Sequence, residues 1–84
     1  MHGEIARTPK QIGNALRRQR RSLGLNQTQV GEKTRLRQAT ISQLEAGEPG
    51  VELRTLFDVL ASLDLELVVR PRTKSSAERI EELF

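Results

Sequence analysis

The chain has 84 residues, with 14 Lys or Arg, 11 Asp or Glu, one histidine and no cysteine. This length fits one small domain with a marginal core, and the lack of cysteine excludes disulfides and thiolate metal sites. No run of about 18 apolar residues is present, and residues 1–7 lack the apolar core of a signal peptide. We therefore expect a soluble cytoplasmic protein, without metal or cofactor, that gains stability by oligomerisation.

The positive charge is concentrated in the first half of the chain. Residues 1–47 hold nine Lys or Arg against three Glu, whereas residues 48–84 hold five against eight Asp or Glu. A basic half suits a polyanionic partner, although a merely solubilising surface would give the same asymmetry. The only aromatic residues are Phe57 and Phe84, so base stacking of the kind that captures single strands is not expected.

The first predicted helix begins at Thr8 and ends before Gly24. Thr8 is the predicted N-cap, Pro9 suits the first helical position, and Gln11 closes a capping box. Gly24 can adopt the left-handed conformation that stops a helix. The helix has an apolar stripe and an opposite basic face, which consist of Ile12, Ala15, Leu16 and Leu23, and of Arg17, Arg18, Arg20 and Arg21.

Two short helices are predicted next. Asn26 caps the second helix with Gln29 at its third position, and Val30 is its main apolar anchor. The apolar pattern then breaks at residues 34–36. A third helix is expected over residues 38–46.

The third and fourth predicted helices close the core. Ile41 and Leu44 of the third helix turn inward, and Gly47 stops it. After a turn, a fourth helix is predicted over about residues 52–63. Its apolar positions follow a helical period and are Leu53, Leu56, Phe57, Leu60 and Leu63.

Residues 65–70 change from a helical period to near alternation, with Leu65, Leu67 and Val69 on one face and Pro71 at the end. A lone strand cannot satisfy its own backbone, and no second strand is visible in the chain. The segment either lies as an extended tail over the core or pairs with a second copy about a two-fold axis. We favour pairing, because it buries the three apolar side chains and adds apolar burial to a domain whose own core is marginal.

The expected organisation has four parts. They are a flexible N-terminus at 1–7, a helical domain at 8–64, a dimerising β-strand at 65–70 and a charged tail at 71–84. Within the tail, the sequence from Ser75 to Glu78 is typical of a cap for one more short helix.

Two short helices joined by a tight turn, with further helices closing a core, make a helix-turn-helix arrangement. The second of the two helices fits the major groove of DNA while the first crosses the backbone. On the predicted outer face of the third helix, Gln38 and Gln43 can bond adenine bidentately, and Ala39 permits contact with a thymine methyl group, beside Ser42. Gln27 lies in the first turn of the second helix, where free amides attract phosphate.

Residues 25–30 and 38–47, which read LNQTQV and QATISQLEAG, resemble the XRE, or phage-repressor-like, family. The resemblance covers roughly residues 10–63. It implies an all-α fold, a compact four- to five-helix lambda-repressor-like bundle that binds operators as a dimer.

The same resemblance implies roles for single residues. The DNA-contacting set would be Gln27, Arg37, Gln38, Ala39, Thr40, Ser42 and Gln43. In this set Gln27 would grip a phosphate, Thr40 would touch backbone or base, and Arg37 would sit at the groove edge. Arg20 would pair with Glu45 and brace the first helix against the recognition helix. An ordinary polar helix face is the alternative interpretation.

Two positions depart from the family pattern. Gly31 stands where alanine is usual, and there it lowers helix propensity by up to about 1 kcal/mol. Arg35 stands where glycine is common in the turn, and it is strained if that position needs a positive φ.

The helical domain is followed directly by residues 61–69 and a short charged tail, which is similar to HipB-type antitoxins. Those proteins pair their terminal strand across a dimer, repress their own operon and bind a HipA-type serine/threonine kinase toxin. The hypothesis is therefore an antitoxin and autorepressor. Its partners would be double-stranded DNA with an inverted-repeat operator, a second copy and such a kinase. A dimeric XRE regulator without a toxin, or a protein-interaction module, remain alternatives. No catalytic constellation is present in the sequence, so we expect no enzyme.

Overall fold

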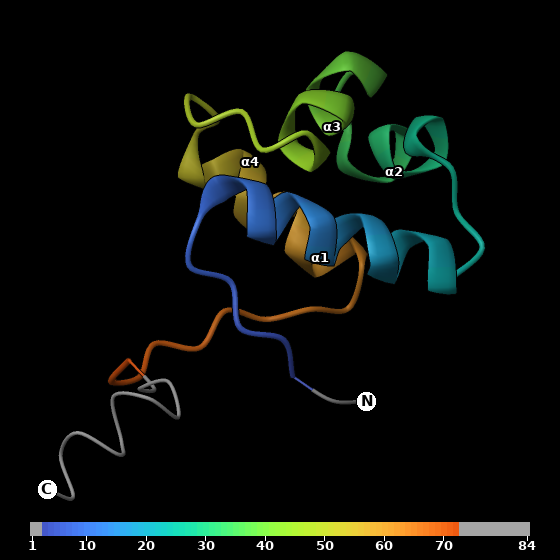
Figure 1. The fold of residues 1–84 in the computed structure, drawn as a ribbon. Coiled ribbons are helices and arrows are strands. Elements are labelled where there is room, and N and C mark those ends of the chain that lie inside the picture. The colour runs from blue at the N-terminus through green and yellow to red at the C-terminus, as the bar shows by residue number, and fades with distance from the viewer. Residues whose placement is uncertain (1–2, 73–84) are drawn as a thin grey trace, which may run out of the picture.

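The computed structural model describes residues 3–72, and this part of the chain contains four α-helices. They are α1 (Pro9–Ser22), α2 (Gln27–Thr34), α3 (Gln38–Glu45) and α4 (Leu53–Ser62). Helix α3 packs against both α1 and α2, and α2 also packs against α4. In Figure 1, α2 and α3 stand above α1, and α4 lies behind it. The predicted all-α bundle is confirmed, and none of the helices within residues 3–72 is long and apolar enough to cross a membrane.

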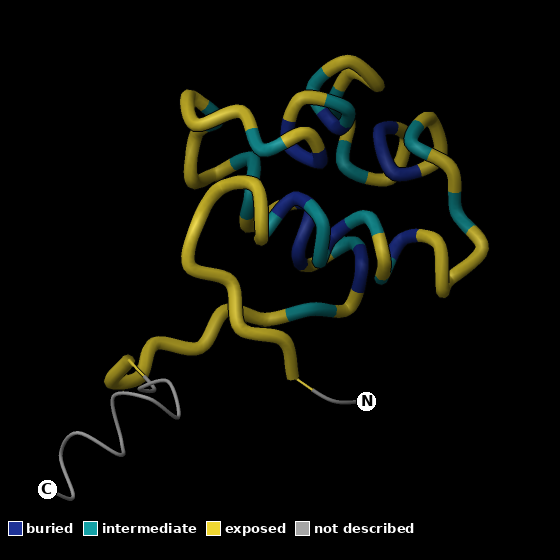
Figure 2. The backbone as a smooth tube through the Cα atoms, in the orientation of Figure 1, coloured by how far each residue is buried: buried dark blue, intermediate teal, exposed yellow. Residues whose placement is uncertain are grey.

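Every helix contributes to a single aliphatic core, where the buried stretches of the four helices face one another (Figure 2). The buried apolar residues are Leu16, Val30, Ile41, Leu44, Val59, Leu60 and Leu63. No aromatic ring lies among them, so the apolar contacts between the helices in this core are purely aliphatic.

The predicted caps are confirmed at α2 and corrected in one detail at α1. At α2, the N–H of Gln29 donates to Oδ1 of Asn26, and the N–H of Asn26 donates to Oε1 of Gln29, both at 2.8 Å. At α1, Oγ1 of Thr8 accepts from the N–H of Gln11 at 3.1 Å. Oε1 of Gln11 accepts from the N–H of Arg7 at 2.6 Å, so the return bond reaches one residue before the N-cap.

The predicted helix stops are also present. Gly24 and Gly47 have φ of +71° and +84°, in the left-handed region where glycine is favoured. The prediction that Leu23 belongs to the apolar stripe of α1 is wrong, because Leu23 is the C-cap and is 48% exposed. The chain turns at this point, and Leu25 packs against the core instead.

The turn between α2 and α3 brings two chain segments into close contact. Arg35 ends α2 with φ 60° and ψ 31°, a left-handed conformation that costs a non-glycine residue about 1–2 kcal/mol. The N–H of Leu36 then donates to the carbonyl of Gly31 at 2.9 Å. A Cβ atom on Gly31 would lie 2.7 Å from the carbonyl oxygen of Leu36. Gly31 lowers helix propensity, but its missing Cβ atom allows the carbonyl of Leu36 to lie close to α2.

Replacing Gly31 with alanine is expected to lower the free energy of unfolding by about 1–3 kcal/mol, although alanine is the better helix former. The added methyl group forces the returning turn away from α2. Urea denaturation measures the change, and Glu32→Ala at the exposed neighbouring position serves as the control, with an effect within about 0.5 kcal/mol. A more stable Gly31→Ala protein would show that the turn relaxes without penalty.

The apolar stripe predicted for α4 is only partly buried. Leu60 and Leu63 are buried and Leu56 is partly buried, whereas Leu53 and Phe57 are 69% and 49% exposed. The prediction is wrong for Leu53 and Phe57, because only the C-terminal half of α4 lies over the core.

The described segments before α1 and after α4 both run along the side of α1 that faces away from α2 and α3 (Figure 1). Residues 65–72 form no strand within the described chain. Because a single copy offers no partner for a ladder, the dimerising strand at 65–70 stays a prediction. The expected tail helix lies outside the described residues.

Candidate nucleic-acid interface

The outer side of α3 presents the residues predicted to contact DNA. Ile41 and Leu44 fix the helix to the core, with 0% and 4% of their surface exposed. The opposite side comprises exposed Arg37, Gln38, Ala39 and Gln43, together with partly buried Thr40 and Ser42. Helix α3 lies at the outer edge of the bundle in Figure 1. One side of α3 is therefore anchored and the other is open, as a helix that enters a major groove requires.

A chain of amide hydrogen bonds connects this surface to the interior. Nε2 of Gln38 donates to Oε1 of Gln27 at 2.5 Å, and Nε2 of Gln27 donates to Oε1 of Glu45 at 3.2 Å. A carboxylate only accepts, so Glu45 sets which end of the Gln27 amide faces Gln38. The second amide hydrogen and Oε1 of Gln38 make no hydrogen bond within residues 3–72. Gln38 therefore keeps the donor and acceptor that bidentate adenine contact needs.

Sequence reasoning placed Gln27 near phosphate and missed its contact with Glu45. The two residues are 18 positions apart and belong to different helices, so no local pattern connects them. Their contact depends on how α2 and α3 are packed.

The ion pair that the family resemblance implies joins α1 to the C-terminal end of α3. Nε and Nη2 of Arg20 donate to the two carboxylate oxygens of Glu45 at 2.6 and 2.9 Å. Arg20 and Glu45 are 8% and 3% exposed, and Nη1 of Arg20 also donates to the carbonyl of Leu25 at 2.9 Å. Arg17 approaches the same carboxylate at 3.5 Å. The paired fork geometry fixes the recognition helix against α1.

Burial raises the pKa of Glu45, but hydrogen bonds from Arg20 and Gln27 and the Arg20 charge outweigh it. The pKa of Glu45 therefore lies below its ordinary value. A carboxylate with a depressed pKa stabilises the fold above its unfolded-state pKa, and this contribution is lost as pH falls through the folded-state pKa.

We expect the free energy of unfolding to fall with pH below about pH 4, the region where glutamates titrate. The side-chain carboxyl carbon of Glu45, followed by NMR, should titrate at lower pH than an ordinary glutamate, for which the pKa is about 4.3. Titration of Glu45 above the ordinary glutamate pKa would contradict the direction of its pKa shift.

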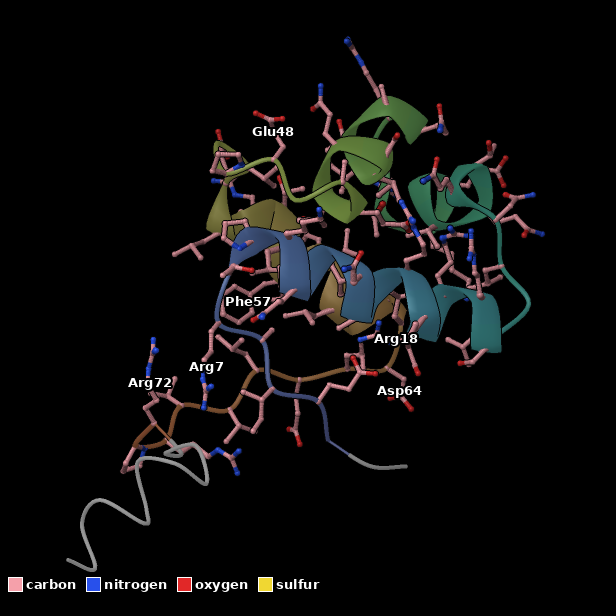
Figure 3. All side chains as sticks on the ribbon, viewed as in Figure 1. Arg7, Arg18, Glu48, Phe57, Asp64 and Arg72 are labelled. Atoms are coloured by element: carbon pink, nitrogen blue, oxygen red, sulfur yellow. The ribbon has the colours of Figure 1, made fainter. Side chains whose placement is uncertain are left out.

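The four arginines predicted on one basic face of α1 have different environments. Arg20 is buried against Glu45, and Arg17 lies beside it. Arg18 lies on the side of α1 that faces the terminal segments (Figure 3), where it pairs with Glu4 at 2.6 and 2.9 Å. Arg21 is exposed. The prediction of one common basic face is therefore wrong, because three of the four guanidinium groups take part in ion pairs, with Glu45 or with Glu4, on different sides of the helix.

This arrangement of four helices, with α2 and α3 as a helix-turn-helix, agrees with known proteins. The helix-turn-helix family model matches residues 16–69. Antitoxin HipB of Escherichia coli strain K12 is 32% identical over 75 residues, which cover 89% of this chain and 85% of that protein. The chain belongs to the HipB-type helix-turn-helix family.

Solved HipB structures have the same fold. A HipB–O2 20mer complex has a TM-score of 0.80 at 29% identity, over 86% of this chain and 100% of the HipB chain. HipB in a HipA–HipB–O2–O3 complex has a TM-score of 0.78 at 30% identity, over 84% and 100% of the two chains. HipB-type proteins are DNA-binding antitoxins rather than enzymes, in agreement with the sequence prediction.

Proposed function

We propose that this protein is a sequence-specific repressor of double-stranded DNA that acts as the antitoxin and autorepressor of a HipA-type kinase toxin operon. The open polar side of α3 carries the proposal, since it is anchored by Ile41 and Leu44 and braced by the buried Arg20–Glu45 pair. Likeness to HipB supports it, because HipB structures include complexes with O2 and with HipA. The protein would act in the cytoplasm.

The proposed DNA contacts are those of the α2–α3 unit. Gln27 and Arg37 would contact the DNA backbone and groove edge. The base-facing set would be Gln38, Ala39, Thr40, Ser42 and Gln43. All are at least partly accessible on adjoining turns of α2 and α3, which supports their joint use.

A selection from random DNA duplexes with the full chain tests the repressor function, carried out at two salt concentrations. The expected product is an inverted repeat whose half-sites are one or more helical turns apart. Affinity should fall steeply as salt rises, because bound phosphates release counterions. Enrichment of no sequence at either salt concentration would refute sequence-specific repression.

A pull-down tests the antitoxin function. The full chain should retain a HipA-type kinase that is encoded beside it, in the presence and absence of operator duplex. DNA binding with no kinase retained would instead support the alternative of a dimeric regulator without a toxin.

The proposed repressor is a homodimer in which residues 65–70 of two copies pair through Leu65, Leu67 and Val69. Leu67 and Val69 are 47% and 92% exposed in a single copy, which leaves apolar surface for a second copy. Leu67→Asp should therefore shift the protein to a monomer, because it places a charge in that contact. Light scattering measures the mass, with Glu32→Asp on the exposed side of α2, outside the proposed strand, as a control. A Leu67→Asp protein that stays dimeric would exclude this interface.

A further inference from the structure

The apolar side chains of the segment after α4 become more exposed along the chain. Leu65 packs partly against the core, whereas Leu67 is 47% exposed and Val69 is 92% exposed. The backbone of residues 66–72 makes no hydrogen bond within the described chain. Its C-terminal half therefore lacks both a ladder partner and a cover for its apolar face.

Alternation restricts how two copies of this segment can pair. In an antiparallel pair, directly opposed side chains lie on the same side of the sheet. The apolar faces of two copies therefore stay together only when the two-fold axis passes through a residue rather than between two residues. Axes through Glu66 or Arg70 would place like charges opposite each other, which is unfavourable. An axis through Leu65 would place Glu66 opposite the partner's Asp64, again a pair of like charges. The remaining choices are Leu67, Val68 and Val69.

Charge complementarity distinguishes these three choices. With the axis through Val68, Glu66 of each copy lies opposite the partner's Arg70, which gives two opposite-charge pairs. With the axis through Leu67, Glu66 lies opposite the partner's Val68. With the axis through Val69, Arg70 lies opposite the partner's Val68. Each alternative places one of these charges opposite a valine and pairs the other only with a residue at the end of the segment, Asp64 or Arg72 of the partner. The Val68 axis leaves neither Glu66 nor Arg70 without an opposite charge, so it is favoured.

The ends of the segment agree with the same axis. Figure 3 shows Asp64 and Arg72 at its opposite ends, so antiparallel pairing about Val68 brings each Asp64 toward the partner's Arg72. Asp64 has φ 58°, so it precedes the strand and would contact the partner only at the strand's end. Pro71 would lie opposite the partner's Leu65. If Glu66, Val68 and Arg70 form the hydrogen-bonded positions, the missing N–H of Pro71 removes no ladder bond.

We propose that two copies pair antiparallel about an axis through Val68, with Glu66 opposite the partner's Arg70. These charges then select a second copy of this chain and set the register of the pair. The proposal rests on the homodimer of the proposed function and adds the residue alignment and the charges that determine it.

Single-cysteine variants of the full chain test the register, because the natural sequence has no cysteine. In the Val68 register, the two copies of residue 68 lie about 5.5 Å apart between Cα atoms, within disulfide range. Val68→Cys should therefore cross-link fastest under mild oxidation, ahead of Leu67→Cys and Val69→Cys. Glu32→Cys on α2 controls for random collisions. Fastest cross-linking by Leu67→Cys or Val69→Cys would overturn the Val68 axis.

Charge reversal tests the ion pairs independently. Glu66→Arg and Arg70→Glu should each raise the dimer dissociation constant about tenfold, and the double variant should restore it. When the two single variants are mixed, the Glu66→Arg strand carries two arginines and the Arg70→Glu strand two glutamates. Random pairing of equal amounts would give half of all dimers as heterodimers, and native mass spectrometry should detect more than this half. A statistical mixture would refute the pairing of Glu66 with the partner's Arg70.

These outcomes separate the register from the proposed function. A wild-type chain that is monomeric in native mass spectra refutes the homodimer and the register together. A dimer that binds the selected operator but cross-links through residue 67 or 69 refutes the register alone.

Discussion

Glu45→Ala is expected to lower the free energy of unfolding by about 3–5 kcal/mol, a large part of the stability of so small a domain. The substitution removes both oxygens that accept from Arg20. Arg20 is only 8% exposed, so its guanidinium group would be left buried without a counter-charge. The carbonyl of Leu25 remains as an acceptor for Arg20, but it carries no charge. Urea denaturation of the full chain, followed by circular dichroism, measures the loss.

Two further variants define the origin of that loss. Glu32→Ala removes an exposed glutamate that takes part in no ion pair among the described residues, so its effect should stay within about 0.5 kcal/mol. A combined Arg20→Met and Glu45→Leu variant should be more stable than Glu45→Ala, because no buried charge remains unpaired. Equal losses for the double variant and Glu45→Ala would locate the effect in packing rather than in the unpaired arginine.

Gln38→Ala is expected to weaken binding to the selected operator by about 1–3 kcal/mol per half-site and to relax the preference at one base pair. The free amide hydrogen and Oε1 of Gln38 are the groups available for bidentate contact with adenine. Fluorescence anisotropy with the operator, with single-base variants of it and with a scrambled duplex measures the effect. Equal weakening on the operator and on the scrambled duplex would show that Gln38 does not read a base.

Gln27→Ala is the informative comparison for that experiment. Oε1 of Gln27 accepts a hydrogen bond from Nε2 of Gln38 at 2.5 Å, and Gln27 is also the proposed phosphate contact. Its removal should therefore weaken binding to every duplex and also relax the preference at the base pair read by Gln38. Lys33→Ala, at an exposed position near the end of α2, serves as a charge-changing control without the amide link.

The proposed register of residues 65–70 would link stability to function in this protein. A core without aromatic residues in a domain of this size is marginal alone, so burial of Leu67 and Val69 against a second copy would add stability. The same pairing would fix the distance between two recognition helices, and with it the half-site spacing of the operator. The charges of Glu66 and Arg70 would then contribute both to the stability of the dimer and to the spacing of the operator half-sites.

The sequence by itself determined the elements and the orientation of α3. The caps at Thr8 and Asn26, the stops at Gly24 and Gly47, and the inward pair Ile41 and Leu44 are all found in the structure. These features depend on contacts between residues three or four positions apart, or on the backbone of one residue, so a linear pattern contains them.

Only the tertiary structure decided what depends on the packing of distant segments. It showed that Gln27 connects Gln38 to Glu45, that the carbonyl of Leu36 approaches Gly31, and that Phe57 remains exposed although its spacing predicts burial. A helical period identifies an apolar face, but it does not show how far the neighbouring helices extend over it. The direction of an amide depends on which acceptor lies within 3 Å or so of it, and only the packed helices fix that distance.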